Sequence, residues 1–149
     1  FPSGKSELTD EFKAILTEFL PKYIKIITQK KYRKSISEIR IEGHTDDVPI
    51  GVTDDSYIDN IQLSQDRARN VLAFLRSLPV YKRLNQSDEL MLKYWLTANG
   101  LSYGRMLDNN KDLALFSEKE INKTNSRRVE FKILTRSEEL IEQVIKQLK

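Results

Sequence analysis

The stretch SEIRIEGHTDD, residues 37–47, decides the fold, because it predicts a half-buried strand that runs directly into acidic residues. Ile39 and Ile41 alternate with charged residues, which is the period of a strand that buries one face. The chain's single histidine, His44, and two consecutive aspartates follow where that strand should end. We therefore expect a polar site with negative charge at the mouth of this strand.

Composition indicates one globular domain. The chain has 149 residues, 39% hydrophobic and 32% charged, which is enough for one core. Its formal charge of +3 is small and spread along the chain, so it does not indicate nucleic-acid binding. The basic run at 30–34 is interpreted as a solvated connector.

Zero cysteines exclude disulfides and thiolate chemistry. No stretch is apolar enough to span a bilayer. Because the chain opens on FPSGKSEL without a methionine, we expect a fragment of a longer protein.

Hydrophobic periodicity predicts the other elements. They are, in chain order, a helix over 9–29, a long loop over 47–60, a helix over 63–78, a strand over 90–100, a strand over 127–135 and a helix over 137–149. Pro21 is expected to kink or split the first helix, and Ser64 to cap the second. In the strand over 90–100, Tyr94, Leu96 and Ala98 share one face. Helices that alternate with half-buried strands indicate an α+β fold, in which helices pack on one side of a small mixed sheet.

The loop after the first strand and the helix that follows it predict a zwitterionic pocket. Asp46 leaves the strand end, and Arg67 is expected in the first turn of the helix. An acid and an arginine beside a helix start suit a ligand with both an ammonium and a carboxylate, because a guanidinium can grip a carboxylate with two hydrogen bonds. The alternative is that Asp46 and Arg67 simply pair with each other.

Three blocks of sequence carry a family resemblance. They are GHTDD, the N-x-x-L-S-x-x-R-A pattern of residues 60–68, and NSRRVE at 125–130. In this order and spacing they resemble the OmpA-like peptidoglycan-binding domain of outer-membrane proteins, peptidoglycan-associated lipoproteins and flagellar stator B subunits, with GHTDDVPI closest to the stator type. The resemblance covers residues 1–135 and implies a βαβαβ-type two-layer sandwich. It leaves 136–149 as a carboxy-terminal helical extension.

The resemblance implies a ligand and roles for individual residues. The ligand is the diaminopimelate of a peptidoglycan stem peptide, with its ammonium on Asp46 and its carboxylate on Arg67. The surrounding motif positions are Thr45, Asn60, Leu63 and Ser64, and Arg128 is expected to brace the site.

The resemblance also implies a non-enzymatic periplasmic domain that needs no cofactor and anchors a larger protein to the cell wall. Its stator-like motif suggests a homodimeric, membrane-anchored parent with an ion-channel partner subunit. The alternatives are a lipoprotein or outer-membrane tether, or an envelope adaptor that binds a protein through the insertion at residues 80–93.

Chemical rivals fit the sequence less well. One imidazole, His44, with the two adjacent aspartates is a poor transition-metal set. Ser64 lacks a nucleophile-elbow pattern, and helix capping explains it. The aromatic residues Tyr94, Trp95 and Tyr103 could stack on sugars or bases, but packing in the core or on the sheet is the favoured interpretation.

Overall fold

The computed structural model describes residues 1–136 and 144–148. Its elements are α1 (Asp10–Ile27), a 3-10 turn η1 (Lys30–Tyr32), β1 (Ile36–His44), α2 (Ser56–Ser77), α3 (Pro79–Lys82), α4 (Gln86–Trp95), β2 (Leu96–Gly100), α5 (Ala114–Ser117), α6 (Lys123–Ser126) and β3 (Arg128–Thr135). Within these residues no helix is both long and apolar enough to cross a bilayer.

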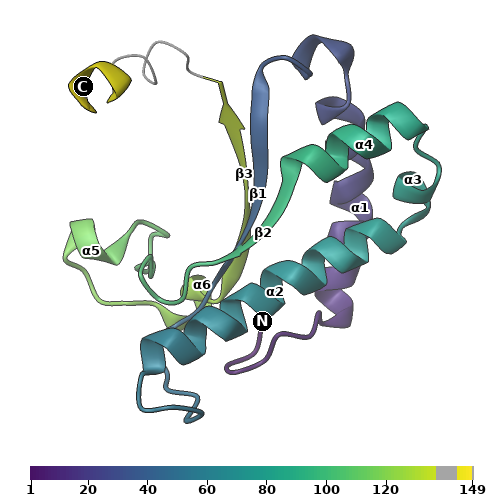
Figure 1. Cartoon of the computed structure of the whole chain (residues 1–149). Coiled ribbons are helices and arrows are strands. Elements are labelled where there is room, and N and C mark those ends of the chain that lie inside the picture. The colour runs from purple at the N-terminus through teal and green to yellow at the C-terminus, as the bar shows by residue number, and fades with distance from the viewer. Residues whose placement is uncertain (137–143, 149) are drawn as a thin grey trace.

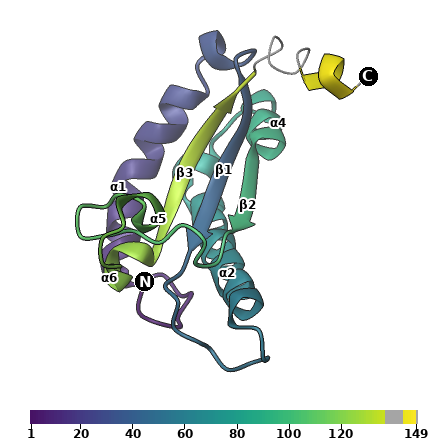
Figure 2. The ribbon, with the colours of Figure 1, turned by 90° about the vertical axis from the view of Figure 1, so that its left-hand side faces the viewer.

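The described part of the chain forms two layers, one a three-stranded mixed sheet and the other made of helices. The strand order is β2-β1-β3, with β1 parallel to β2 and antiparallel to β3. Helices α1, α2 and α4 lie on one side of the sheet (Figure 1), and Figure 2 looks onto the opposite side. Ile39 and Ile41 are fully buried under the helices. The predicted α+β sandwich with helices on one side is confirmed.

The helix after β1 begins earlier than the sequence pattern predicts. Asp55 caps α2 by accepting hydrogen bonds from the backbone N–H groups of Tyr57 and Ile58, so Ser64 is not the cap and the loop is shorter than predicted. Periodicity misses these turns because Tyr57, Ile58 and Gln62 are exposed and give no apolar stripe. As a result Arg67 lies in the middle of α2, away from the N–H groups of the helix start.

Residues 90–95 are helical, so the predicted strand over 90–100 is half wrong. Asn85 caps α4 through the backbone N–H of Asp88, and the strand β2 starts only at Leu96. Tyr94 is exposed on α4, whereas Trp95 is fully buried and donates its indole N–H to the Ile36 carbonyl at 3.1 Å. An apolar run of this length does not distinguish helix from strand by period alone.

Two other predictions concern the ends of the chain. α1 is continuous through Pro21, so the helix is not split; Leu20 and Ile24, buried on either side, hold it against the core. Of the predicted helix at 137–149, residues 144–148 are helical with exposed apolar side chains, and the remainder lies outside the described residues.

Two glycines let α2 approach the sheet at the ends of β1 and β2. A Cβ atom on Gly43 would lie 1.9 Å from the Ser64 carbonyl oxygen, and one on Gly100 would lie 2.5 Å from the Gln65 backbone nitrogen. Backbone atoms cannot move aside as a flexible side chain can. The contact therefore fixes the height of the middle of α2 above the strand ends.

We expect Gly43→Ala to lower the free energy of unfolding by at least about 3 kcal/mol, because the added methyl group must push α2 off the sheet. Urea unfolding measures this. Gly104→Ala is the matched control, because its Cβ would meet atoms only at 3.6 and 3.7 Å. Its stability should change by less than about 0.5 kcal/mol. Equal losses in the two variants would contradict the close approach of α2.

Candidate ligand site

Asp46 lies in a turn immediately beyond β1 and is almost completely buried. Its Oδ1 accepts the backbone N–H of Val48 at 3.1 Å, which shapes the turn. Its Oδ2 forms an ion pair with Arg127 Nη1 at 2.8 Å. The alternative pairing of Asp46 with Arg67 is therefore wrong, and the partner is an arginine that follows α6.

Arg67 is fully buried beneath the same strand end. Its Nη1 donates to the His44 carbonyl at 2.9 Å, its Nε to Lys5 at 2.8 Å and its Nη2 to Pro2 at 3.1 Å. Burial lowers the pKa of Arg67 to about 10, while the charge of Asp46 acts in the opposite direction. The guanidinium is still protonated at neutral pH, so a positive charge is held close to Asp46.

Residues 1–6, here called the amino-terminal strap, cover both arginines. Besides the two carbonyls on Arg67, the Phe1 ring lies over that guanidinium at 4.9 Å. The Phe1 carbonyl accepts Arg127 Nε at 2.9 Å, and Asn70 holds the Ser6 carbonyl at 3.0 Å. The strap was missed from the sequence because its contacts use backbone carbonyls, which leave no residue-type signal.

Asn60, Ser64 and Thr45, predicted around Asp46, make hydrogen bonds through the side chains of Asn60 and Ser64 and the backbone of Thr45. Asn60 Nδ2 donates to the carbonyls of Ser56 and Val48, and so ties α2 to the loop. Ser64 Oγ donates to Ile61 and accepts the buried N–H of Ser102 at 3.0 Å. Thr45 is buried with its backbone N–H on the Ser102 carbonyl. These hydrogen bonds hold together the backbone segments that surround Asp46.

Leu63 is placed differently, beside a cleft of about 560 Å³. The strap forms one side of this cleft through Gly4 and Ser6. α2 and the loop after β1 form the rest, through Ile50, Val52, Thr53, Ile58, Asp59, Ile61, Gln62, Leu63 and Asp66. The cleft thus adjoins the strap on the side of α2.

Arg128 does not reach Asp46, so the prediction that it braces this site is wrong. It pairs with Glu130 Oε1 at 2.6 Å and donates to the carbonyls of Ser126 and Arg105. The alternating pattern of β3 could have shown this from the sequence. It places Arg128 on the same face as Glu130 and Lys132, which is opposite the face that packs on the helices. Arg127, just before the strand, takes the predicted role.

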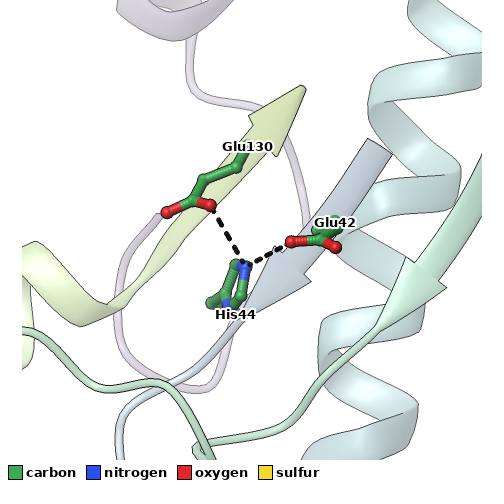
Figure 3. Close-up of side chains that lie close together, drawn as sticks. All are labelled: Glu42, His44 and Glu130. Carbon is green, nitrogen blue, oxygen red and sulfur yellow. Dashed lines mark ion pairs between the residues drawn. The ribbon is translucent and has the colours of Figure 1, made fainter. Parts of the chain in front are cut away.

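A charged cluster occupies the side of the sheet opposite α1, α2 and α4 (Figure 3). His44 Nε2 lies 3.4 Å from Glu42 Oε1 and 3.9 Å from Glu130 Oε2. The three side chains could hold a metal ion by distance, and they differ from the set His44, Asp46 and Asp47 considered from sequence. However, Lys132 Nζ lies 3.1 and 3.6 Å from those same two carboxylate oxygens. The ammonium stands where a cation would bind, so we assign no metal to this cluster.

Comparison with known proteins gives a family and a fold. The sequence model described as the OmpA family matches residues 1–107. The Zorya protein ZorB of Escherichia coli strain Crooks is 32% identical over 149 residues. That alignment covers 99% of the chain but 58% of ZorB, so the chain spans little more than half of this relative.

Two solved structures share the architecture at 18% identity, which shows the fold alone. The C-terminal domain of Helicobacter pylori MotB superposes with a TM-score of 0.58, over 95% of the chain and 87% of that domain. The peptidoglycan-associated lipoprotein from Burkholderia pseudomallei gives 0.50, over 91% of the chain and 86% of the lipoprotein.

We expect Ser64→Ala to lower the free energy of unfolding by about 1–3 kcal/mol, because it leaves the buried N–H of Ser102 without its acceptor. Thermal and urea unfolding measure the loss. Ser77→Ala is the control, since Ser77 Oγ bonds only the Phe74 carbonyl at an exposed position and its removal should change stability by less than about 0.5 kcal/mol. Equal effects would contradict the bridging role of Ser64.

We also expect stability to fall as the pH falls from 7 to 4. Burial, and next the charge of Arg128, lower the pKa of His44 to about 4, against the opposite effects of Glu130 and Glu42. The unfolded chain takes up this proton near pH 6.5, so the contribution is complete above that pH and is lost toward pH 4. Its size is on the order of 2–3 kcal/mol.

Urea unfolding at pH 7, 6 and 5 measures this dependence. His44→Gln should flatten it, because glutamine does not titrate. An unchanged slope in that variant would assign the pH dependence to other groups.

Proposed function

Since the chain belongs to the OmpA family, we propose that it binds cell-wall peptidoglycan without catalysis and anchors a longer envelope protein to the wall. The observation that carries the proposal is a buried aspartate at the end of β1 that pairs with the guanidinium of Arg127 and lies close enough to Arg67 for their charges to interact. Asp46, Arg67 and Arg127 all lie there, and Arg67 and Asp46 are buried. Charged side chains are seldom buried unless they are paired or serve a ligand.

The charges suit a zwitterionic end group. The Asp46 carboxylate matches an ammonium, and Arg67 matches a carboxylate with two parallel N–H donors. The diaminopimelate of a stem peptide presents both groups on one carbon. Arg127 gives the site one positive charge more than negative, which favours a ligand whose carboxyl group is ionised rather than amidated.

The affinity of one site is weak, and the polymer makes the attachment firm. A charge-assisted hydrogen bond contributes about 1.5–3 kcal/mol net, so two or three of them, less the cost of association, give roughly micromolar to millimolar binding. A wall offers many identical end groups. A membrane-anchored or dimeric parent meets them at high effective concentration, which raises the overall strength without new contacts.

The parent is inferred from the relatives. We infer a periplasmic location and a membrane-anchored parent of stator type, with an ion-channel partner subunit and a homodimeric state, because the chain resembles ZorB over almost its whole length and has the fold of a MotB domain. The runner-up within the family is a lipoprotein or outer-membrane tether, whose fold the Burkholderia lipoprotein shares.

The structure gives the adaptor alternative one supporting feature and one against it. Leu90 and Tyr94 are exposed on α4, where a protein partner could dock. However, α3 and α4 also supply Tyr81, Leu92 and Trp95 to the buried core. The insertion at 80–93 therefore supports the sheet, and removing it would unfold the domain rather than test a partner.

The decisive test is co-sedimentation with insoluble peptidoglycan that contains diaminopimelate. We expect the unaltered chain to pellet and Asp46→Asn to lose at least about tenfold in affinity, because one charge-assisted interaction is removed. Asparagine retains an oxygen for the Val48 N–H, so the turn is preserved.

Asp47→Asn is the matched control. Asp47 is adjacent in sequence but more exposed, and pairs with Lys123 at 3.4 Å. It should pellet like the unaltered chain. If the unaltered chain stays in solution, or if both variants lose binding equally, Asp46 is not the anchor. Loss of pelleting in Leu90→Ser alone would place the contact on α4 rather than at Asp46.

A further inference from the structure

The strap occupies the hydrogen-bond donors that the ligand needs. Arg67 uses Nε and Nη2 on the carbonyls of Lys5 and Pro2, and Arg127 uses Nε on the carbonyl of Phe1. A carboxylate that is to be gripped by Arg67 must replace these carbonyls, because the guanidinium has no exposed surface.

We propose that the strap is an intramolecular competitor for the peptidoglycan site, and that residues 1–6 leave Arg67 and Arg127 when the ligand's carboxylate binds. This inference rests on the proposed function. Strap and ligand present the same chemistry, which is oxygen acceptors for guanidinium N–H groups. A carboxylate carries a full negative charge and the carbonyls carry none, so the exchange favours the ligand electrostatically.

The strap's few anchors make it displaceable. Most of its residues are exposed, and its backbone turns at Gly4, which adopts a positive φ of 67°. The anchors are the three carbonyls on the arginines, the Ser6 carbonyl on Asn70, and the Phe1 ring, which also packs edge-on against Phe12 at 5.4 Å. The fully buried residues of the hydrophobic core come from other segments, so the sheet and helices keep their packing when the strap opens.

The closed strap reduces the apparent affinity, which equals the intrinsic affinity multiplied by the fraction of molecules whose strap is open. A change that destabilises only the closed strap must therefore tighten ligand binding. Gly4→Val is such a change, because side chains adopt positive φ at a cost while a Cβ at Gly4 would meet nothing within 4 Å. The penalty shifts the strap equilibrium roughly five- to thirtyfold toward the open form.

The experiment measures binding of a soluble muropeptide ending in diaminopimelate, by calorimetry, with the full chain. We expect Gly4→Val to bind roughly five- to thirtyfold more tightly than the unaltered chain. Ser3→Val is the matched control, because it adds the same side chain at the neighbouring exposed residue, whose φ is negative. Its affinity should stay within about twofold. Circular dichroism checks that both variants are folded.

A second readout follows the strap directly. The chain has no cysteine, so Ser3→Cys introduces a single attachment point for a spin label. We expect the label to become more mobile as muropeptide is added, and to be more mobile without muropeptide when Gly4→Val is also present. Asp46→Asn weakens muropeptide binding but leaves the contacts of the strap in place. In this variant a correspondingly higher muropeptide concentration should be needed before the label becomes more mobile.

The outcomes separate the two proposals. If muropeptide binds in an Asp46-dependent manner but the label does not respond and a loosened Gly4→Val strap leaves affinity unchanged, the strap inference is overturned and the proposed function stands. If no variant binds in an Asp46-dependent manner, the proposed function fails and the strap inference fails with it.

Discussion

The backbone contact between α2 and the sheet sets the geometry on which the site depends. Gly43 and Gly100 let the helix lie directly on the strand ends, where any side chain would separate them. At this height Arg67, one turn beyond Ser64, reaches the last carbonyl of β1. The arginine is therefore fixed by main-chain geometry on both sides. A helix held farther away would leave the same residue in solvent, and the site would lose its buried cation.

Burying the charged groups of this site costs free energy when they have no hydrogen-bond partners. With partners in place, the same burial makes the site discriminate between ligands. A guanidinium out of water needs acceptors for its donors, and Arg67 finds three carbonyls. Asp46 is likewise satisfied by one backbone N–H and one arginine. The low-dielectric surroundings strengthen each of these contacts. They also lower the affinity of any ligand that displaces an acceptor without supplying another in its place. This penalty is the physical basis of discrimination between ligands.

The sequence predicted the site's residue types better than its contacts. Alternation in residues 37–45 and 128–133 located two strands, and the spacing of family motifs located Asp46 and Arg67. The start of α2 was missed because its first turns are solvated and have no apolar stripe. The helical end of the 90–100 run was missed because a short apolar segment suits either structure. Strand alternation could have separated Arg127 from Arg128, because it places Arg128 on the face of β3 that points away from the helices. The strap came only from three dimensions, since its backbone carbonyls carry no distinguishing pattern.

The site also has a consequence for the order of folding. Its contacts join residues 1–5 to Arg67, and Arg127 to both Phe1 and Asp46, so they close loops that span from about half of the chain to most of it. Long loops carry the largest closure entropy, and contacts across them form after local helices. The region around Asp46 thus becomes complete only when the last strand has joined the sheet. A nascent or partly unfolded chain has helices and hydrophobic contacts but lacks this arrangement of Asp46 and the two arginines. Under the proposed function, attachment is therefore confined to molecules that have finished folding.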